Sequence, residues 1–145
     1  MPISTVSARF SVARPATALM LLLLVAACGP SAAPTSAPAA PGGPTITMHS
    51  EGDARKFEPA TLTVPKGSVV TWKHSSGSGH TATTDPAKVK DPGRVAIPPG
   101  ATAWDSGTLS DGRTWSTAFT VPGTYKYVCL PHEDRDMVGT IVVSD

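Results

Sequence analysis

The chain has 145 residues, of which 40% are hydrophobic, 6% aromatic and 16% charged, and its formal net charge is +1. Arg9 and Arg14 fall in a predicted leader, and setting them aside leaves ten basic against eleven acidic residues, a net charge of −1. A near-neutral chain without a basic stripe lacks the charge needed to bind phosphate groups, which excludes nucleic-acid binding.

The N-terminus has the pattern of a secretory signal. Residues 1–15 carry two positive charges and no acidic residue, and an apolar run (ATALMLLLLVAA) follows over residues 16–27. A membrane-spanning helix needs about 20 apolar residues, so this run is too short to span comfortably. We therefore predict a signal peptide over residues 1–27. The two arginines of the leader are not adjacent, which favours the general export pathway over the twin-arginine pathway.

The sequence Val25-Ala26-Ala27-Cys28 resembles a bacterial lipobox, in which the cysteine is lipidated and becomes the new N-terminus. The alternative is ordinary cleavage after Ala27, which would leave Cys28 as an exposed thiol, a liability in a secreted protein. Lipidation of Cys28 predicts a protein anchored to the cell envelope, on its periplasmic or extracellular face. It also leaves Cys129 as the only thiol, so no intramolecular disulfide can form.

Residues 28–44 hold the lipidation site and then GPSAAPTSAPAAPGGP, a segment rich in proline and alanine with little to bury. Such a segment cannot repay the entropy of ordering, and we predict a disordered tether that reaches at most about 50 Å. Residues 45–145 remain as one domain, which is large enough to form a hydrophobic core.

This domain is composed of short strand-like segments. Residues 85–100, with DPAKVKDPG and PPG, predict a long irregular connection. No apolar period of 3.6 residues persists over three turns. Frequent turns between short strands predict an all-β, single-domain antiparallel Greek-key β-sandwich. The predicted strands are residues 45–50, 61–64, 68–74, 80–84, 101–106, 115–121, 124–129 and 138–143.

The segment that carries chemistry is YVCLPHEDRDM, residues 127–137. It offers a thiolate, an imidazole and a thioether from Cys129, His132 and Met137, in the spacing Cys-x2-His-x4-Met between two predicted strands. One loop at the end of a sandwich can place these groups around a single point. A fourth ligand must come from elsewhere. His80, which follows the loop SSGSG, is the better candidate, and His74 is the alternative.

Two imidazoles, a thiolate and a distant thioether are typical of a blue-copper site. Thiolate and thioether favour Cu(I), while imidazole also suits Cu(II), so the geometry can serve both states. Other interpretations of Cys129 remain open at this point. It could be a buried structural thiol. A nucleophilic cysteine would need an accessible thiolate and a cleft. Structural zinc rarely uses methionine, and a copper enzyme would need an open coordination position or a second histidine cluster.

From about Phe57 to Val143 the chain resembles the cupredoxin family, nearest to its plastocyanin and pseudoazurin branch. The matching stretches are FEPATLTVPKGSVVTW, GHT, DSGTL, FTVPGTYKYVCLPH and MVGTIVV. The resemblance implies a cupredoxin-like fold and one type 1 copper ion, with the ligands His80, Cys129, His132 and Met137.

Three positions depart from the family pattern. Asp136 stands where glycine is common before the methionine, although aspartate tolerates left-handed backbone better than most residues. Thr81 and His74 stand where the family commonly has asparagine. These departures put the hydrogen bonds around the ligands in question rather than the metal itself.

The predicted function is that of an extracytoplasmic single-electron carrier, not an enzyme, and we expect a monomer. Its expected partners are redox proteins such as c-type cytochromes or a membrane oxidase or reductase. The alternative is a copper-binding or copper-delivery protein on the same fold. Three acids and one base follow His132 before Met137, a local charge of −2 that predicts a partner with a basic docking face.

Overall fold

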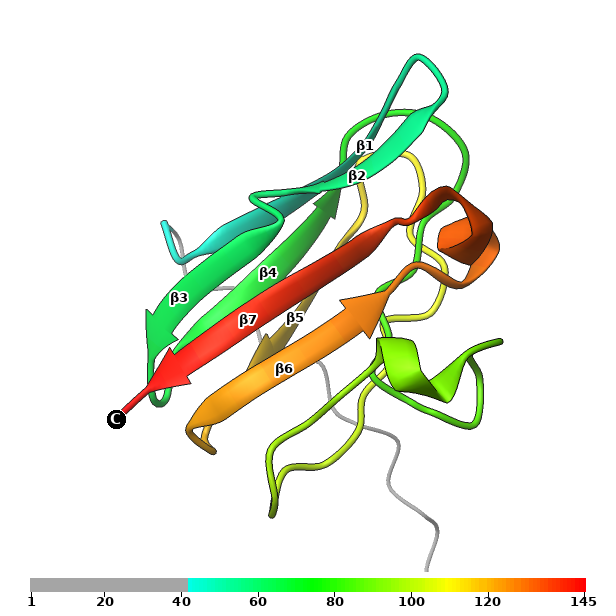
Figure 1. Cartoon of the computed structure of the whole chain (residues 1–145). Helices are drawn as coiled ribbons and strands as arrows, with labels where there is room; N and C mark the ends of the chain where they lie inside the picture. The colour runs from blue at the N-terminus through cyan, green and yellow to red at the C-terminus, as the bar shows by residue number, and fades with distance from the viewer. Residues whose placement is uncertain (1–41) are drawn as a thin grey trace, which may run out of the picture. The chain divides into compact units, whose positions relative to one another are not determined.

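The computed structural model describes residues 42–145 (Figure 1). The predicted signal peptide, Cys28 and most of the predicted tether lie outside these residues. No helix in the described part of the chain is long and apolar enough to cross a membrane. The elements are the strands β1 (Thr45–Glu51), β2 (Ala54–Glu58), β3 (Thr61–Pro65), β4 (Val69–His74), β5 (Thr114–Ala118), β6 (Gly123–Val128) and β7 (Val138–Ser144), and the short 3-10 helices η1 (Pro92–Arg94) and η2 (Leu130–Arg135).

The strands form two sheets, one in the order β2-β1-β4-β5 and the other in the order β3-β7-β6 (Figure 1). This arrangement confirms the predicted all-β sandwich. Three of the five strand pairings are antiparallel, whereas β1 pairs with β4 and β3 pairs with β7 in parallel. The parallel pairs arise because the chain crosses from one sheet to the other after β2 and returns after β3.

The core lies between the sheets and is rich in aromatic rings. Alternate residues of each strand face inward, as the pleat requires, and Trp72 of β4 is fully buried at the centre. Four rings lie with their centroids 5.0–6.2 Å from that of Trp72. Aromatic pairs of this kind add about 0.5–1.5 kcal/mol each beyond the area they bury. The four rings belong to Trp104, Trp115, Phe119 and Tyr127.

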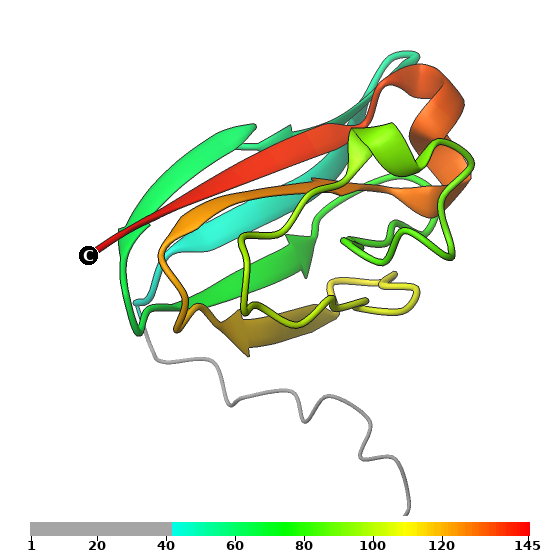
Figure 2. The same cartoon turned by 60° about the horizontal axis from the view of Figure 1, so that its bottom comes forward.

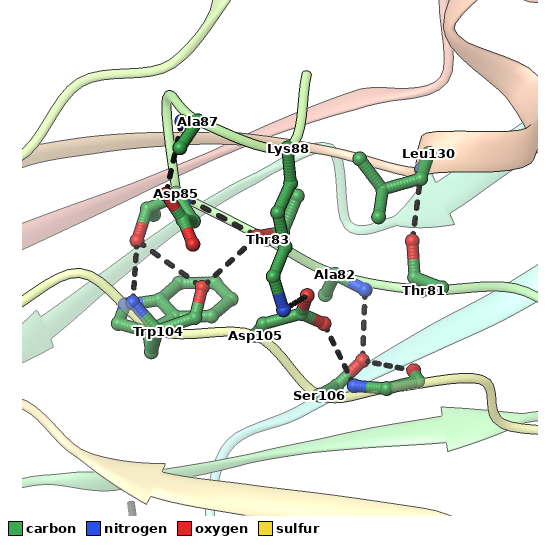
Figure 3. Close-up of polar contacts among 12 residues, drawn as sticks. Thr81, Ala82, Thr83, Asp85, Ala87, Lys88, Trp104, Asp105, Ser106 and Leu130 are labelled. Atoms are coloured by element: carbon green, nitrogen blue, oxygen red, sulfur yellow. Dashed lines mark hydrogen bonds and ion pairs between the residues drawn. The ribbon is translucent and has the colours of Figure 1, made fainter. Parts of the chain in front are cut away.

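Two predicted strands are wrong, because residues 80–84 and 101–106 form only isolated bridges. Thr83 pairs with Asp105 on one side and with Val128 on the other, so the segment switches partners instead of following one strand. Side-chain oxygens replace part of the backbone ladder: the Ala82 N–H donates to Ser106 Oγ at 2.9 Å (Figure 3). The strand β2 was not predicted from the sequence.

Residues 85–100 form the predicted irregular connection, interrupted only by η1. The part of this connection that includes η1 lies at the end of the sandwich that carries η2, and the part after η1 runs along the edge of the sandwich beside β6 (Figure 2). Ala96 bridges to Lys126 of β6, and Val89 and Val95 form a small apolar cluster with Val128. The long connection therefore supports the loop between β6 and β7.

Candidate metal centre

Three of the four predicted ligands place their donor atoms in one buried cluster. The Nδ1 atoms of His80 and His132 are 3.2 Å apart, and Cys129 Sγ lies 3.7 Å and 3.2 Å from them, respectively. Imidazole and thiolate bonds to a metal such as zinc are about 2.0 and 2.3 Å long, so three ligands spread around one ion lie roughly 3.3–3.8 Å apart. The spacing is close to that expected for a single metal ion.

The loop from β6 to β7 is closed by its own backbone. The Cys129 N–H donates to the Met137 carbonyl at 3.0 Å, and the His132 N–H donates to the Cys129 carbonyl at 3.0 Å. Asp136 adopts the left-handed conformation at φ 55°, which confirms that an aspartate can take the backbone conformation that this turn requires. Met137 follows it and is fully buried. The fourth predicted ligand is therefore held inside the same closed loop.

The segment that carries His80 is joined to this loop by backbone pairing. Thr83 and Val128 exchange two hydrogen bonds of 3.0 and 3.1 Å, immediately before the end of β6. His80 itself exchanges two hydrogen bonds with Leu109, at 3.0 and 2.8 Å. These bonds bring His80 to Cys129, which is 49 residues away in sequence.

The loop SSGSG orients both imidazoles, a role that the sequence did not reveal. His80 Nε2 donates to the Ser76 carbonyl at 3.3 Å, and His132 Nε2 is hydrogen-bonded to Ser78 Oγ at 3.2 Å. Fixing Nε2 in this way turns Nδ1 of each ring inward. Such outer hydrogen bonds set the tautomer and orientation of histidines that bind metals.

Thr81 supplies two contacts at the position where the family commonly has asparagine. Its N–H donates to Cys129 Sγ at 3.3 Å. Its Oγ1 accepts the Leu130 N–H at 2.8 Å, as Figure 3 shows. The first contact stabilises negative charge on the sulfur, and the second ties the His80 segment to the loop. The substitution therefore retains hydrogen bonding around the thiolate.

Burial sets the protonation of the cluster. It lowers the pKa of His80 to about 4, with a smaller contribution from nearby His132, and it also lowers the pKa of His132. Both imidazoles are therefore neutral at neutral pH and can bind a metal. Burial raises the pKa of the Cys129 thiol, so a metal ion must displace its proton on binding.

His74 lies beside the cluster but does not contribute to it. Its ring centroid is 5.5 Å from that of His80, and its Nε2 is 3.4 Å from the Ser78 carbonyl. Its buried Nδ1 has no hydrogen-bond partner within residues 42–145. The structure thus gathers His80, not the alternative His74, with Cys129 and His132.

The acidic residues after His132 meet bases from outside the loop, so the net charge of −2 predicted from the local sequence is wrong for the folded loop. Asp134 forms an ion pair with Lys90, and Asp136 pairs with Arg94 at 2.6 Å. Glu133 is buried and accepts the Lys90 N–H at 3.0 Å. The compensating bases come from the connection around η1, far away in sequence.

Comparison with known proteins agrees with this geometry. Residues 44–144 match the family described as copper binding proteins, plastocyanin/azurin family. The chain is 32% identical over 99 residues to plastocyanin of Scenedesmus fuscus, an alignment covering 68% of this chain and 97% of that protein. It is 30% identical over 98 residues to chloroplastic plastocyanin of Tetradesmus obliquus, covering 68% of this chain and 65% of that protein. Among solved structures, a mutant of amicyanin in its reduced Cu(I) form matches with a TM-score of 0.56 and 29% identity, over 79% of this chain and 95% of that one.

Proposed function

Because the chain belongs to the plastocyanin/azurin family of copper-binding proteins, we propose that it is a single-electron carrier and not an enzyme. Its proposed cofactor site is one type 1 copper ion held by His80, Cys129, His132 and Met137. The observation that supports this assignment is the buried triangle of two Nδ1 atoms and one Sγ, closed by the loop that contains Met137. When bound, copper supplies the one-electron couple between Cu(I) and Cu(II).

The protein contributes soft and borderline donors, a water-poor environment and rigidity. His80, Cys129 and Met137 are fully buried, which keeps solvent from the donor atoms. Backbone bonds from β6, from the His80 segment and within the loop hold the residues that carry the donors in place. A site fixed in this way changes little between oxidation states, which favours fast electron exchange.

Burial also favours a carrier over a copper-delivery protein. Delivery needs donors that a second protein can reach and displace, whereas three of these four side chains have no exposed surface. His132 is the exception, with 8% of its surface exposed. One exposed imidazole edge is enough for an electron to leave but not for a metal ion.

The visible spectrum tests the proposal directly. After Cu(II) is added to the purified protein, we expect an intense thiolate-to-copper charge-transfer band that bleaches on reduction and returns on oxidation. The physical reason is that a thiolate bound to Cu(II) would donate charge to the metal when it absorbs visible light. A colourless Cu(II) complex would contradict the assignment.

We further propose that the carrier works outside the cytoplasm, exported by residues 1–27 and anchored by lipidated Cys28 through a tether that ends at residue 44. The support is the sequence pattern of a basic leader, a short apolar run and a lipobox. Such a tether would let residues 45–145 meet redox proteins such as c-type cytochromes or a membrane oxidase or reductase.

Replacing Cys28 by serine should move the protein from the membrane fraction to the soluble fraction. Stable anchoring needs more than one acyl chain, and in this chain Cys28 is the proposed attachment point for all of them. Fractionation followed by immunoblotting measures the change. Cys129→Ser, which removes the other cysteine, is the matched control and should stay with the membranes. A Cys28→Ser variant that remains membrane-bound would overturn the lipid anchor.

A further inference from the structure

Two arginines lie where η2 meets the β1–β2 turn, one on β2 and one at the end of η2. Arg55 of β2 is half-buried, and its Nη1 donates to the carbonyls of Gly52 and Ala54 at 2.9 and 3.0 Å. Arg135, at the end of η2, is exposed and donates to the Asp53 carbonyl at 3.3 Å. Neither arginine takes part in an ion pair within residues 42–145. Both guanidinium groups are thus fixed by backbone, and their charges are not cancelled by a contacting carboxylate.

The opposite side of the loop holds Glu133, Asp134 and Asp136 together with Lys90 and Arg94, whereas Asp53 lies in the β1–β2 turn beside the arginines. The charged residues that lie in this loop or bond to it are three bases and four acids, and Arg55 of the adjoining β1–β2 turn adds a fourth base. The sum is zero instead of the −2 of the local sequence. These charges are separated in space, since the ion pairs gather beside η1 and the arginines gather beside the β1–β2 turn. The bases are Arg55, Lys90, Arg94 and Arg135, and the acids are Asp53, Glu133, Asp134 and Asp136.

Both arginines lie at the end of the sandwich that carries His132. Arg135 follows His132 by three residues in η2, and its hydrogen bond to the Asp53 carbonyl joins η2 to the β1–β2 turn, whose carbonyls also hold Arg55. His132 is the one proposed ligand with an exposed edge. The positive side of the loop therefore adjoins the point at which an electron would enter or leave.

We propose that the protein docks its redox partners through an acidic surface on the partner, which meets Arg55 and Arg135 beside His132. This inference rests on the proposed electron-carrier function and reverses the sign of the docking charge that the sequence predicted. Opposite charges across an interface speed the encounter and fix its orientation more than they tighten the final complex. The ion pairs around η1 exert weaker long-range fields because their charges cancel at close range.

Small redox reagents of opposite charge test the sign of this surface. The full chain, loaded with copper and reduced, is oxidised by ferricyanide, an anion, or by tris(phenanthroline)cobalt(III), a cation. We expect the bimolecular rate with ferricyanide to fall as ionic strength rises, and the rate with the cobalt complex to rise. At low ionic strength, the double variant Arg55→Gln with Arg135→Gln should be oxidised by ferricyanide about tenfold more slowly than the native protein. Arg55→Lys, which keeps the charge, should retain most of the native rate.

Lys66→Gln is the control for net charge, because Lys66 is hydrogen-bonded to Ser144 at the opposite end of the sandwich. It should change the ferricyanide rate much less than Arg55→Gln does. Two results would overturn the proposed docking surface. One is a rate of oxidation by ferricyanide that depends neither on salt nor on the two arginines. The other is a decrease in this rate that is no larger in Arg55→Gln than in Lys66→Gln.

A second measurement does not depend on electron transfer. Hexacyanochromate(III), a redox-inert paramagnetic anion, is titrated into the full chain without metal while amide NMR signals are recorded. Broadening should be strongest at residues 52–55 and 132–136 and should weaken in the double arginine variant. Broadening centred on the opposite end would overturn the inference. Since this footprint needs no copper, a missing charge-transfer band beside a positive footprint would contradict the proposed function alone.

Discussion

Replacing Cys129 by alanine is expected to abolish the charge-transfer band and most of the copper affinity. The sulfur is the only thiolate in the buried donor triangle, 3.2 Å from one imidazole nitrogen and 3.7 Å from the other. Without it, two neutral imidazoles and a thioether remain, and no donor carries the negative charge that offsets the ion. Loss of one outer hydrogen bond costs about 10–100-fold in metal affinity, and loss of this ligand should cost considerably more. Absorption spectroscopy and competition with a chelator of known affinity measure both effects.

Three further variants separate the loss of a ligand from damage to the fold. Cys129→Ser changes the sulfur to oxygen at nearly constant volume and should also lose the band, while its far-ultraviolet circular dichroism stays native. His74→Ala should keep the band, because His74 lies outside the donor cluster. Colour that survives in Cys129→Ser would show that the thiolate does not bind copper.

Met137→Leu should keep copper and raise the reduction potential, because a weak donor to Cu(II) is removed.

The ligand loop could be predicted because its chemistry is local. Cys129, His132 and Met137 lie within nine residues between two strands, so their spacing alone places them at one end of a sandwich. His80 was a weaker inference from the residues alone, since its approach depends on the pairing of Thr83 with Val128, which no local pattern shows. For His80 the resemblance to a family supplied what spacing could not.

The predicted net charge around the ligand loop was wrong because the bases that compensate it are far away in sequence. Lys90 and Arg94 lie 39–44 residues before the loop atoms that they contact, so a count of charges within the loop could not include them. Arg55 is still farther away in sequence and reaches the site through the β1–β2 hairpin. The sign of a surface depends on tertiary contacts, whereas the donor set of a single loop depends mainly on sequence.

The misplaced strands also have physical causes. The residues of the 80–84 segment have high β-propensity, but serine and threonine oxygens take over hydrogen bonds that a partner strand would make. The missed strand β2 has the sequence ARKFE, in which Phe57 is the only buried residue. One buried position gives no alternation to detect, and the strand forms because β1 pairs with it along its whole length.

Replacing Gly139 by alanine is expected to lower the free energy of unfolding by about 1–3 kcal/mol, the usual cost of overpacking a core. Gly139 of β7 pairs directly with Tyr127 of β6. A Cβ at Gly139 would lie 2.2 Å from Tyr127 Cζ and 2.3 Å from its Oη. The phenol ring is fully buried and cannot move aside easily, because its centroid is 4.7 Å from that of Phe57 and 5.5 Å from that of Trp72. The strain must therefore be taken up by displacing β7.

Displacement of β7 should also reach the metal centre, because Met137 lies two residues before Gly139 and its carbonyl accepts the Cys129 N–H at 3.0 Å. We expect the charge-transfer band of Gly139→Ala to shift or weaken. Urea denaturation should show the lower free energy of unfolding in the same variant. Gly93→Ala is the control, since its Cβ would meet only the exposed Asp91 carboxylate at 3.1 Å, and it should change stability by less than about 0.5 kcal/mol. Tyr127→Leu removes the hydroxyl and the ring atoms that clash, so in the double variant the loss should fall short of the sum of the single losses by roughly 0.5–3 kcal/mol. Strict additivity, or a Gly139→Ala variant as stable as the native protein, would show that the ring does not require the space above Gly139.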